Sequence, residues 1–265
     1  MKIIILGNGN LGTYMKRYFD FKKINNIQFT RKDIDASKLN LSFLLKNINR
    51  NDVVINCIGI LKPKIIDTGI ENTFKINSIF PNKVKQICDI KKAKFIHICS
   101  DCVFNGDKGN YSENDIPDAN DIYGLSKSLV TNGTIIRTSF IGKYNGLLKW
   151  IIDNKDSSID GYNNCIWNGV TALELAKCIE EIIINNLFWN GVRHLHSPAK
   201  ITKYKLCKLI SKIYNLNIKV KRTYADSIEG QKINKVLDRS LYSKYKIKMI
   251  GLEKQLYELR EFDSK

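Results

Sequence analysis

The sequence predicts an α/β fold, a doubly wound parallel sheet with helices on both faces and a smaller C-terminal part. Short runs rich in β-branched residues recur through the first half of the chain, as buried strands do. The stretches between them carry apolar residues at helical spacing. At 265 residues the chain is long enough to bury one core, or two closely joined ones.

The elements of this sheet follow one another regularly. We expect strands at residues 2–6, 27–30, 52–57, 94–100 and 134–140. Two apolar stripes predict intervening helices: one of Leu39, Phe43, Leu44 and Ile48, the other of Phe74, Ile79, Val84 and Ile87.

The alternation of strands and helices becomes less regular after about residue 144. A helix over 171–185, a strand near 192–196 and a helix over 203–214 are still predicted. No linker rich in Pro, Gly or Ser separates the halves. We therefore expect a first domain over 1–143 and a second part over 144–265, with a strand near 191–196 returning to the sheet.

The composition is strongly basic: 43 Lys and Arg against 26 Asp and Glu, a formal net charge of +17. Such a charge suits a nucleic acid, an acidic membrane surface or a phosphorylated ligand, unless the lysines are simply scattered over the surface. No apolar run approaches the roughly 20 residues of a membrane span, and the run at 3–6 is too short for a signal peptide. The seven irregularly spaced cysteines indicate reduced thiols in a cytoplasmic protein.

A metal site is not expected. Cys99 and Cys102 have no second CxxC pair to complete a zinc site. His194 and His196 fall on one face of a strand, but no acidic or cysteine cluster adjoins them in sequence. We expect two ordinary histidines.

A glycine-rich turn follows the first strand and opens a helix. Glycines there permit a tight turn and a close backbone approach, and the helix N-terminus can hold a pyrophosphate through its N–H groups. This is the dinucleotide pattern of a Rossmann fold, and it places a cofactor against Gly7, Asn8, Gly9, Asn10, Leu11 and Gly12.

The second strand ends in cations. Arg31 and Lys32 stand where a ribose 2′-phosphate would lie, which favours NADP(H) over NAD(H). Asp33 and Asp35 follow closely and could serve as the acid that holds a 2′-hydroxyl, so NAD(H) stays an alternative.

The most specific chemical signal lies in mid-chain. Ser100 ends the 94–100 strand, and Tyr123 and Lys127 form a YxxxK pair that one helix face would hold together. An adjacent ammonium should lower the pKa of Tyr123 from its usual value near 10. The tyrosine could then protonate a ketone oxygen as hydride arrives, while Ser100 donates a hydrogen bond to that oxygen.

These motifs, in this order, resemble the extended short-chain dehydrogenase/reductase superfamily, and most closely dTDP-4-dehydrorhamnose reductases. The similarity spans essentially the whole chain and is sharp from residue 7 to about 139. It rests on residues 100–106, 111–115, 117, 123–127 and 137–139.

The resemblance implies NADPH-dependent reduction of the 4-keto group of a nucleotide-activated 4-keto-6-deoxy sugar, in surface polysaccharide or deoxysugar biosynthesis. It makes Ser100, Tyr123 and Lys127 the catalytic triad and Asn77 a helix-kinking support for proton relay. It assigns residues 1–143 to the cofactor, with contacts at Cys57, Ile58, Gly59, Tyr123 and Lys127, and residues 144–265 mainly to the nucleotide sugar. Substrate contacts are expected at Ser100, Asp101, Cys102, Lys149, Trp167 and Asn168.

Two departures from the family pattern matter. The turn is GxGxxG where the family usually has GxxGxxG, so the pyrophosphate contacts can differ. Cys102 replaces a usual tyrosine and is similar to the cysteine of GDP-fucose synthases and UDP-rhamnose epimerase/reductases. A bifunctional epimerase/reductase is therefore an alternative, with a Cys102 thiolate as base and Lys149 as the opposing acid. Otherwise Cys102 is a small cysteine packed at the strand end.

Two other classes of function are a nucleic-acid-binding protein and a catalytically silent cofactor-binding protein. The basic region over 203–222 could bind nucleic acid, but its helix also has an ordinary apolar stripe and no recognition motif accompanies it. A catalytically silent NADP-binding regulatory subunit is the other alternative, and the intact triad argues against it. We expect a nucleotide-sugar ligand, neither nucleic acid nor membrane as partner, and leave a homodimer open.

Overall fold

The computed structural model describes residues 1–228, 231–232, 236–245 and 247–265. The chain divides into two compact units that alternate along the sequence. Unit 1 comprises Met1–Val103, Pro117–Arg137 and Ala176–Arg193, and unit 2 comprises Phe104–Ile116, Thr138–Leu175 and His194–Lys265. Unit 1 thus draws on both sides of residue 143. The assignment of cofactor binding to 1–143 and of substrate binding to 144–265 stays a prediction.

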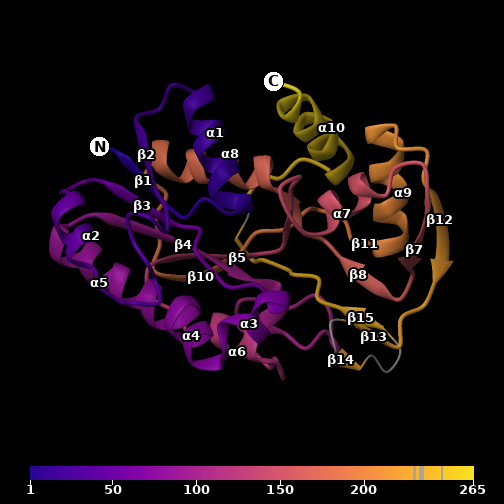
Figure 1. Ribbon diagram of the computed structural model, residues 1–265, viewed down its shortest axis with the longest axis horizontal. Coiled ribbons are helices and arrows are strands. Elements are labelled where there is room, and N and C mark those ends of the chain that lie inside the picture. The colour runs from indigo at the N-terminus through magenta and orange to yellow at the C-terminus, as the bar shows by residue number, and fades with distance from the viewer. Residues whose placement is uncertain (229–230, 233–235, 246) are drawn as a thin grey trace. The chain divides into compact units, whose positions relative to one another are not determined.

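A six-stranded sheet forms the core of unit 1, and it confirms the predicted doubly wound α/β class (Figure 1). Its strand order is β10-β5-β4-β3-β1-β2, and the neighbours β2, β1, β3 and β4 pair in parallel. The strands are β1 (Ile3–Leu6), β2 (Asn26–Phe29), β3 (Val53–Asn56), β4 (Lys94–Ser100), β5 (Thr134–Thr138) and β10 (Gly191–His194). The strand order reverses between β1 and β3, where sheets of this kind bind ligands.

Helices cover both faces of this sheet. On one face, α2 (Ser42–Asn47) and α5 (Phe80–Lys91) pack against side chains of β1 and β3 such as Ile4 and Val54. On the other face lie α1 (Asn10–Phe21) and α8 (Ala172–Ile184), as Figure 1 shows. The Tyr18 hydroxyl donates a hydrogen bond to Glu180 and joins these two helices.

Two helices differ from their sequence-based expectation. The stripe that begins at Leu39 yields a helix only from Ser42, because Leu39 has a left-handed φ of 51°. The stripe from Phe74 is not one helix: α4 (Ile70–Phe74) passes into a π-helical turn, Lys75–Ile79, before α5 begins. A π-turn inserts an extra residue into the helical register, and such turns occur frequently at functional sites.

Short helices complete unit 1. They are a 3-10 turn (Lys62–Lys64), α3 (Ile65–Thr68), a 3-10 turn (Asp101–Val103) and α6 (Ile122–Ser128).

The described residues of unit 2 form small sheets and three helices. β8 (Cys165–Trp167) lies between β11 (Ile201–Thr202) and β15 (Leu237–Asp238). The remaining pairs are β6 (Phe140–Ile141) with β9 (Val170–Thr171), β7 (Ser158–Tyr162) with β12 (Lys219–Thr223), and β13 (Ser227–Ile228) with β14 (Gln231–Lys232). Its helices are α7 (Leu147–Asp153), α9 (Lys203–Tyr214) and α10 (Leu252–Asp263).

The described residues contain no helix long and apolar enough to cross a membrane. In the same part of the chain, no group of three or more His, Cys, Asp or Glu side chains could hold a metal ion. His194 is instead buried, with Nδ1 3.0 Å from the carbonyl oxygens of Tyr111 and Tyr242.

Candidate active site

The glycine-rich turn has the geometry of a phosphate cradle. Gly7 has a φ of 96°, which favours glycine, and a Cβ on Gly12 would lie only 2.0 Å from the carbonyl oxygen of Gly7. Nothing lies within 4 Å of a Cβ built on Gly9, so open space meets the N-terminus of α1. The first turn of α1 carries no acidic residue that would repel an anion. The residues present therefore fit a dinucleotide pyrophosphate.

A pocket of about 200 Å³ opens at the carboxyl ends of β1, β2 and β3, where the strand order reverses. Its wall includes many of the predicted cofactor residues, from the glycine-rich turn, from the end of β2 and from the loop after β3. The lining residues are Gly7, Asn8, Gly9, Arg31, Ile34, Asp35, Ala36, Cys57, Ile58, Gly59, Ile60 and Ile76.

The remaining predicted cofactor residues lie elsewhere. The side chain of Leu11 and the Cα of Gly12 are buried in α1, and Asn10, Lys32, Tyr123 and Lys127 do not line this pocket.

The loop after β2 contributes two apolar residues to the pocket that were not predicted from the sequence. Ile34 and Ala36 are buried at the pocket although no strand or helix includes them. The available signal was an apolar residue at every second position between polar ones, from Ile34 to Ala36.

The charged groups of this loop favour a phosphate over a ribose hydroxyl. Asp33 accepts hydrogen bonds from the backbone N–H and hydroxyl of Thr30, and Asp35 accepts the same pair from Ser37. The bonds from Ser37 hold the pKa of Asp35 below its usual value. The Arg31 guanidinium is 3.6 Å from Asp35 yet its side chain is 83% exposed, so it can reach an anion in the pocket.

The predicted catalytic side chains come together at the end of β4. Asp121 caps α6 by accepting the Gly124 N–H at 2.8 Å. A Cβ on Gly124 would lie 2.2 Å from the Cys102 carbonyl oxygen, so only glycine lets α6 approach the turn after β4 so closely. This approach allows a side-chain hydrogen bond between Ser100 and Tyr123.

The expected effect of the lysine on the tyrosine is wrong for this chain. Burial raises the pKa of Tyr123, the neighbouring Cys102 raises it further, and the hydrogen bond from Ser100 only partly offsets this. Burial likewise lowers the pKa of Lys127, whose Nζ donates to the Ile98 carbonyl at 3.0 Å. Desolvation disfavours both charges, so Tyr123 keeps its proton.

Lys127 connects this group to the pocket. Gly59 lines the pocket, and a Cβ built on it would lie 3.4 Å from Lys127 Nζ and 3.3 Å from Asn77 Oδ1. The pocket wall and the YxxxK helix are therefore in direct contact within unit 1.

Asn77 sits in the π-helical turn and is fully buried. Its Oδ1 accepts the Ile60 N–H at 2.7 Å, and its Nδ2 donates to the Ile60 carbonyl at 3.1 Å and to Ser126 Oγ at 3.0 Å. Asn77 thereby ties the pocket loop to α6. The role of Asn77 in a proton relay, which the family resemblance implies, stays a prediction.

Asp101 and Cys102 flank the same group. Asp101 is buried, with Oδ1 3.1 Å from Ser100 Oγ, and the Cys102 N–H donates to Ser100 Oγ at 3.1 Å. The Cys102 thiol is half-buried and close enough to affect the Tyr123 pKa. The structure thus brings both residues to the catalytic group.

The other predicted substrate residues belong to unit 2. Trp167 is buried and its Nε1 donates to Ser139 Oγ at 2.8 Å. Asn168 is also buried; its Nδ2 donates to the Leu241 carbonyl and its Oδ1 accepts the Leu241 N–H. Lys149 is exposed and 2.8 Å from Asp153 on the same helix. The polar atoms of Trp167 and Asn168 thus serve internal contacts, and the substrate role of all three stays a prediction.

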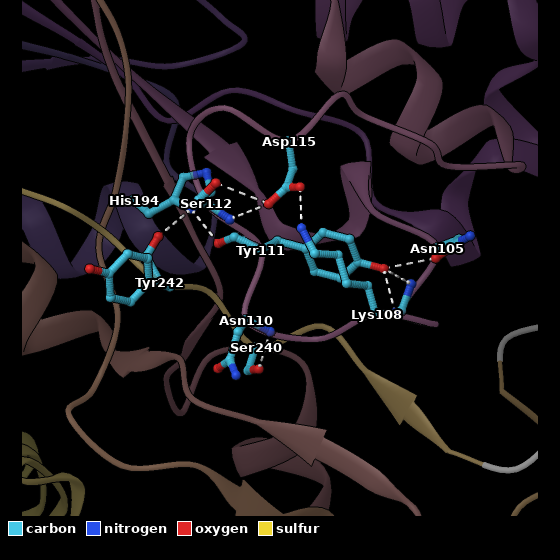
Figure 2. Close-up of polar contacts among 10 residues, drawn as sticks. Asn105, Lys108, Asn110, Tyr111, Ser112, Asp115, His194, Ser240 and Tyr242 are labelled. Atoms are coloured by element: carbon cyan, nitrogen blue, oxygen red, sulfur yellow. Dashed lines mark hydrogen bonds and ion pairs between the residues drawn. The ribbon is translucent and has the colours of Figure 1, made fainter.

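The family-like motif at 111–115 builds a loop of unit 2. Figure 2 shows the Tyr111 hydroxyl donating to Asn105 Oδ1 at 2.9 Å and accepting the N–H groups of Gly106 and Lys108, each at 3.1 Å. Lys108 in turn forms an ion pair with Asp115. The motif is a structural element of its loop.

The chain is similar to known reductases in both sequence and fold. A family model described as the RmlD substrate binding domain matches residues 1–264. The probable low-salt glycan biosynthesis reductase Agl14 of Haloferax volcanii is 30% identical over 99 residues, which are 34% of this chain and 33% of that protein. This chain therefore matches only a third of the length of that curated relative.

Solved structures match over nearly the whole chain. The dTDP-4-dehydrorhamnose reductase of Bacillus anthracis, in complex with NADP, superposes with a TM-score of 0.84 at 22% identity, covering 98% of this chain and 99% of that one. A hypothetical dTDP-4-dehydrorhamnose reductase from Sulfolobus tokodaii gives 0.76 at 25% identity, with coverage of 91% and 92%. These likenesses establish the fold.

Proposed function

The chain belongs to the RmlD substrate binding domain family, and from this premise we propose that it is an NADPH-dependent reductase acting on the 4-keto group of a nucleotide-activated 4-keto-6-deoxy sugar. The observation that carries the proposal is the contact between pocket and catalytic group. Gly59 lines the pocket while its Cβ position is 3.4 Å from Lys127 Nζ, on the helix that presents Tyr123 to Ser100.

The residues that would hold the cofactor follow from the pocket. The turn from Gly7 to Gly9 and the first turn of α1 suit the pyrophosphate. Arg31 suits a 2′-phosphate, because the nearby Asp33 and Asp35 are engaged within their own loop. The NADP complex of the Bacillus anthracis reductase supports this choice. NAD(H) is the alternative cofactor.

The protein side of the reaction is acid catalysis. Bound NADPH supplies the hydride that adds to the carbonyl carbon. The Tyr123 hydroxyl gives its proton to the carbonyl oxygen, so ketone, hydride and proton together make the alcohol. The raised pKa of Tyr123 keeps it in the protonated form that this step consumes. Ser100 donates a hydrogen bond to the same oxygen, and Lys127 supports the tyrosinate left behind.

The proposed substrate side includes Asp101 and Cys102 beside the catalytic group, and Lys149 as a cation for the diphosphate. The product would supply glycan assembly, in keeping with the glycan biosynthesis reductase among its relatives.

The test is reduction of dTDP-, UDP- and GDP-linked 4-keto-6-deoxy sugars with NADPH deuterated at nicotinamide C4. We expect one deuterium at sugar C4 of the product by mass spectrometry and NMR. If NADPH binds to the protein and none of these sugars is reduced, the catalytically silent cofactor-binding subunit replaces our proposal.

A second candidate, epimerisation before reduction, is favoured by the position of Cys102 beside Tyr123. A 4-ketone acidifies the neighbouring C–H bonds, and a thiolate there could remove such a proton. In deuterated water, wild-type protein would then place solvent deuterium at C3 or C5, and Cys102→Ala would not. Equal labelling by both proteins removes the epimerase.

A further inference from the structure

A buried histidine lies in the core of unit 1 next to the pocket loop, and the proposed reaction does not use it. His97 is on β4, and its side chain is 0% exposed. The parallel register places it opposite Asn56, the last residue of β3, which is also 0% exposed. His97 Nδ1 and Asn56 Nδ2 are 3.0 Å apart.

The contacts of Asn56 fix how this pair is hydrogen-bonded. Asn56 Oδ1 accepts the backbone N–H of Ile58 at 3.1 Å, so its other end, the Nδ2 amide, faces the histidine. An NH₂ group can only donate, so His97 Nδ1 must accept and carries no proton. The single proton of the neutral ring then sits on Nε2.

The surroundings keep the ring neutral. Burial and the positive charge of Lys127 both lower the pKa of His97 well below its usual value. A protonated ring would place an N–H against the N–H of Asn56. The hydrogen bonds of Asn56 therefore select the neutral ring with its proton on Nε2, an atom for which the described residues offer no hydrogen-bond partner.

The pair acts on the pocket wall. Ile58 lines the pocket, and its N–H is the group that Asn56 holds. Two residues later Asn77 holds Ile60 in the same loop. We propose that His97, as an Nε2-protonated acceptor acting through Asn56, is a positioning residue that sets the backbone of Ile58 for cofactor binding. This inference rests on the proposed NADPH site.

The variant that tests it is His97→Leu, which keeps an apolar side chain in the core but leaves Asn56 Nδ2 without its acceptor. We expect the Kd for NADPH to rise about tenfold, because an Asn56 amide without its acceptor no longer holds the Ile58 N–H at the pocket wall in place. The rate at saturating NADPH should change by less than about twofold, because no reacting atom is touched. His97→Asn, whose Oδ1 can take the place of Nδ1, should restore most of the binding.

The matched control is Phe95→Leu. Phe95 is buried two residues earlier on the same strand, stacks against His97 and lies outside the pocket lining. It should lose stability as a core truncation does while binding NADPH normally. Unchanged NADPH binding by His97→Leu, equal weakening by Phe95→Leu, or no rescue by His97→Asn would overturn the proposal.

The ring itself provides a measurement that does not depend on folding of a variant. Long-range ¹⁵N–¹H NMR of wild-type protein should show the His97 proton on Nε2 and a bare Nδ1; a proton on Nδ1 would overturn the proposal. Wild-type protein that gives the Nε2 form but binds no NADPH would instead refute the proposed function.

Discussion

Two buried asparagines, one in each unit, make the same local contact with different consequences. Asn77 in unit 1 binds the N–H and carbonyl of Ile60 at 2.7 and 3.1 Å. Asn168 in unit 2 binds the N–H and carbonyl of Leu241 at 2.9 and 2.8 Å. Each amide replaces the two hydrogen bonds that a neighbouring strand would supply.

The difference lies in what each asparagine holds. Ile60 lines the pocket, and Asn77 also contacts Ser126 between the two predicted catalytic residues of α6. Leu241 is buried in unit 2 and does not line this pocket. A buried, fully bonded polar group therefore does not by itself mark a functional site; its connection to an open pocket does.

The largest expected effect is on the reduction rate, and it distinguishes Tyr123 in unit 1 from Tyr111 in unit 2. Tyr123→Phe removes the proton donor, and we expect the reduction rate to fall by about 10²- to 10⁴-fold with folding and NADPH binding retained. Tyr111→Phe should instead leave the rate per folded molecule unchanged. It strips two backbone N–H groups of their acceptor and should cost about 1–3 kcal/mol of unfolding free energy. Steady-state kinetics and thermal unfolding distinguish the two. A Tyr123→Phe enzyme with ordinary turnover would remove it from the mechanism.

The asparagine pair gives the next effect. Asn77→Ala and Asn168→Ala should each lower the free energy of unfolding by about 1–3 kcal/mol, since both unpair backbone groups. Only Asn77→Ala should also weaken NADPH binding, by about tenfold, because only its loop lines the pocket. Chemical denaturation and fluorescence titration measure the two quantities. Equal loss of NADPH affinity in both variants would contradict the distinction between the units.

A smaller effect is expected at the end of β2. Arg31→Ala should raise the Kd for NADPH about fivefold or more and leave that for NADH nearly unchanged, because the guanidinium serves the extra phosphate. Lys32→Ala is the control, since Lys32 carries the same charge but does not line the pocket. Isothermal titration with both cofactors tests this. A parallel loss for NADPH and NADH would mean that Arg31 shapes the loop and does not select the cofactor.

The smallest expected effect is that of pH on the rate of reduction, which should stay constant across the neutral range. Since burial raises the Tyr123 pKa above its usual value of 10.0, the donor is protonated throughout the neutral range. The rate of reduction at saturating substrates should be flat from about pH 6 to 9 and decline only above about pH 10. The reverse oxidation needs the tyrosinate and should rise with pH. A decline of reduction centred near pH 7 would show that Tyr123 titrates there.

Much of the fold was predictable because its signals are local. The helix expected over 203–214 is observed as Lys203–Tyr214, and the strand expected over 94–100 as Lys94–Ser100. The π-turn at Lys75–Ile79 was not predicted, although the step of five residues from Phe74 to Ile79 is longer than the three or four of an α-helical face. The sequence could not show the alternation of the two units, which depends on contacts between distant segments.

The candidate site was predictable to the extent that motifs carry it. The glycine-rich turn and the Ser100–Tyr123–Lys127 group stand where their motifs indicate. The pKa of Tyr123 was predicted in the wrong direction, because spacing reveals a neighbouring lysine but not the burial that outweighs it. His97 gave no sequence signal, since only the sheet register brings it beside Asn56.

The order of segments in unit 1 has a consequence for synthesis of the protein. The edge strand β10 comes from residues 191–194, long after the strand β5 that it borders. A chain leaves the ribosome N-terminus first. The Gly133 carbonyl therefore has no hydrogen bond from the Gly191 N–H, and the Thr134 hydroxyl none to the Trp189 carbonyl, until those later residues have been made. Until then the nascent sheet exposes an open edge, the kind of surface that recruits other strands. A chain that stalls before residue 191 therefore keeps the β5 edge open to pairing with other strands.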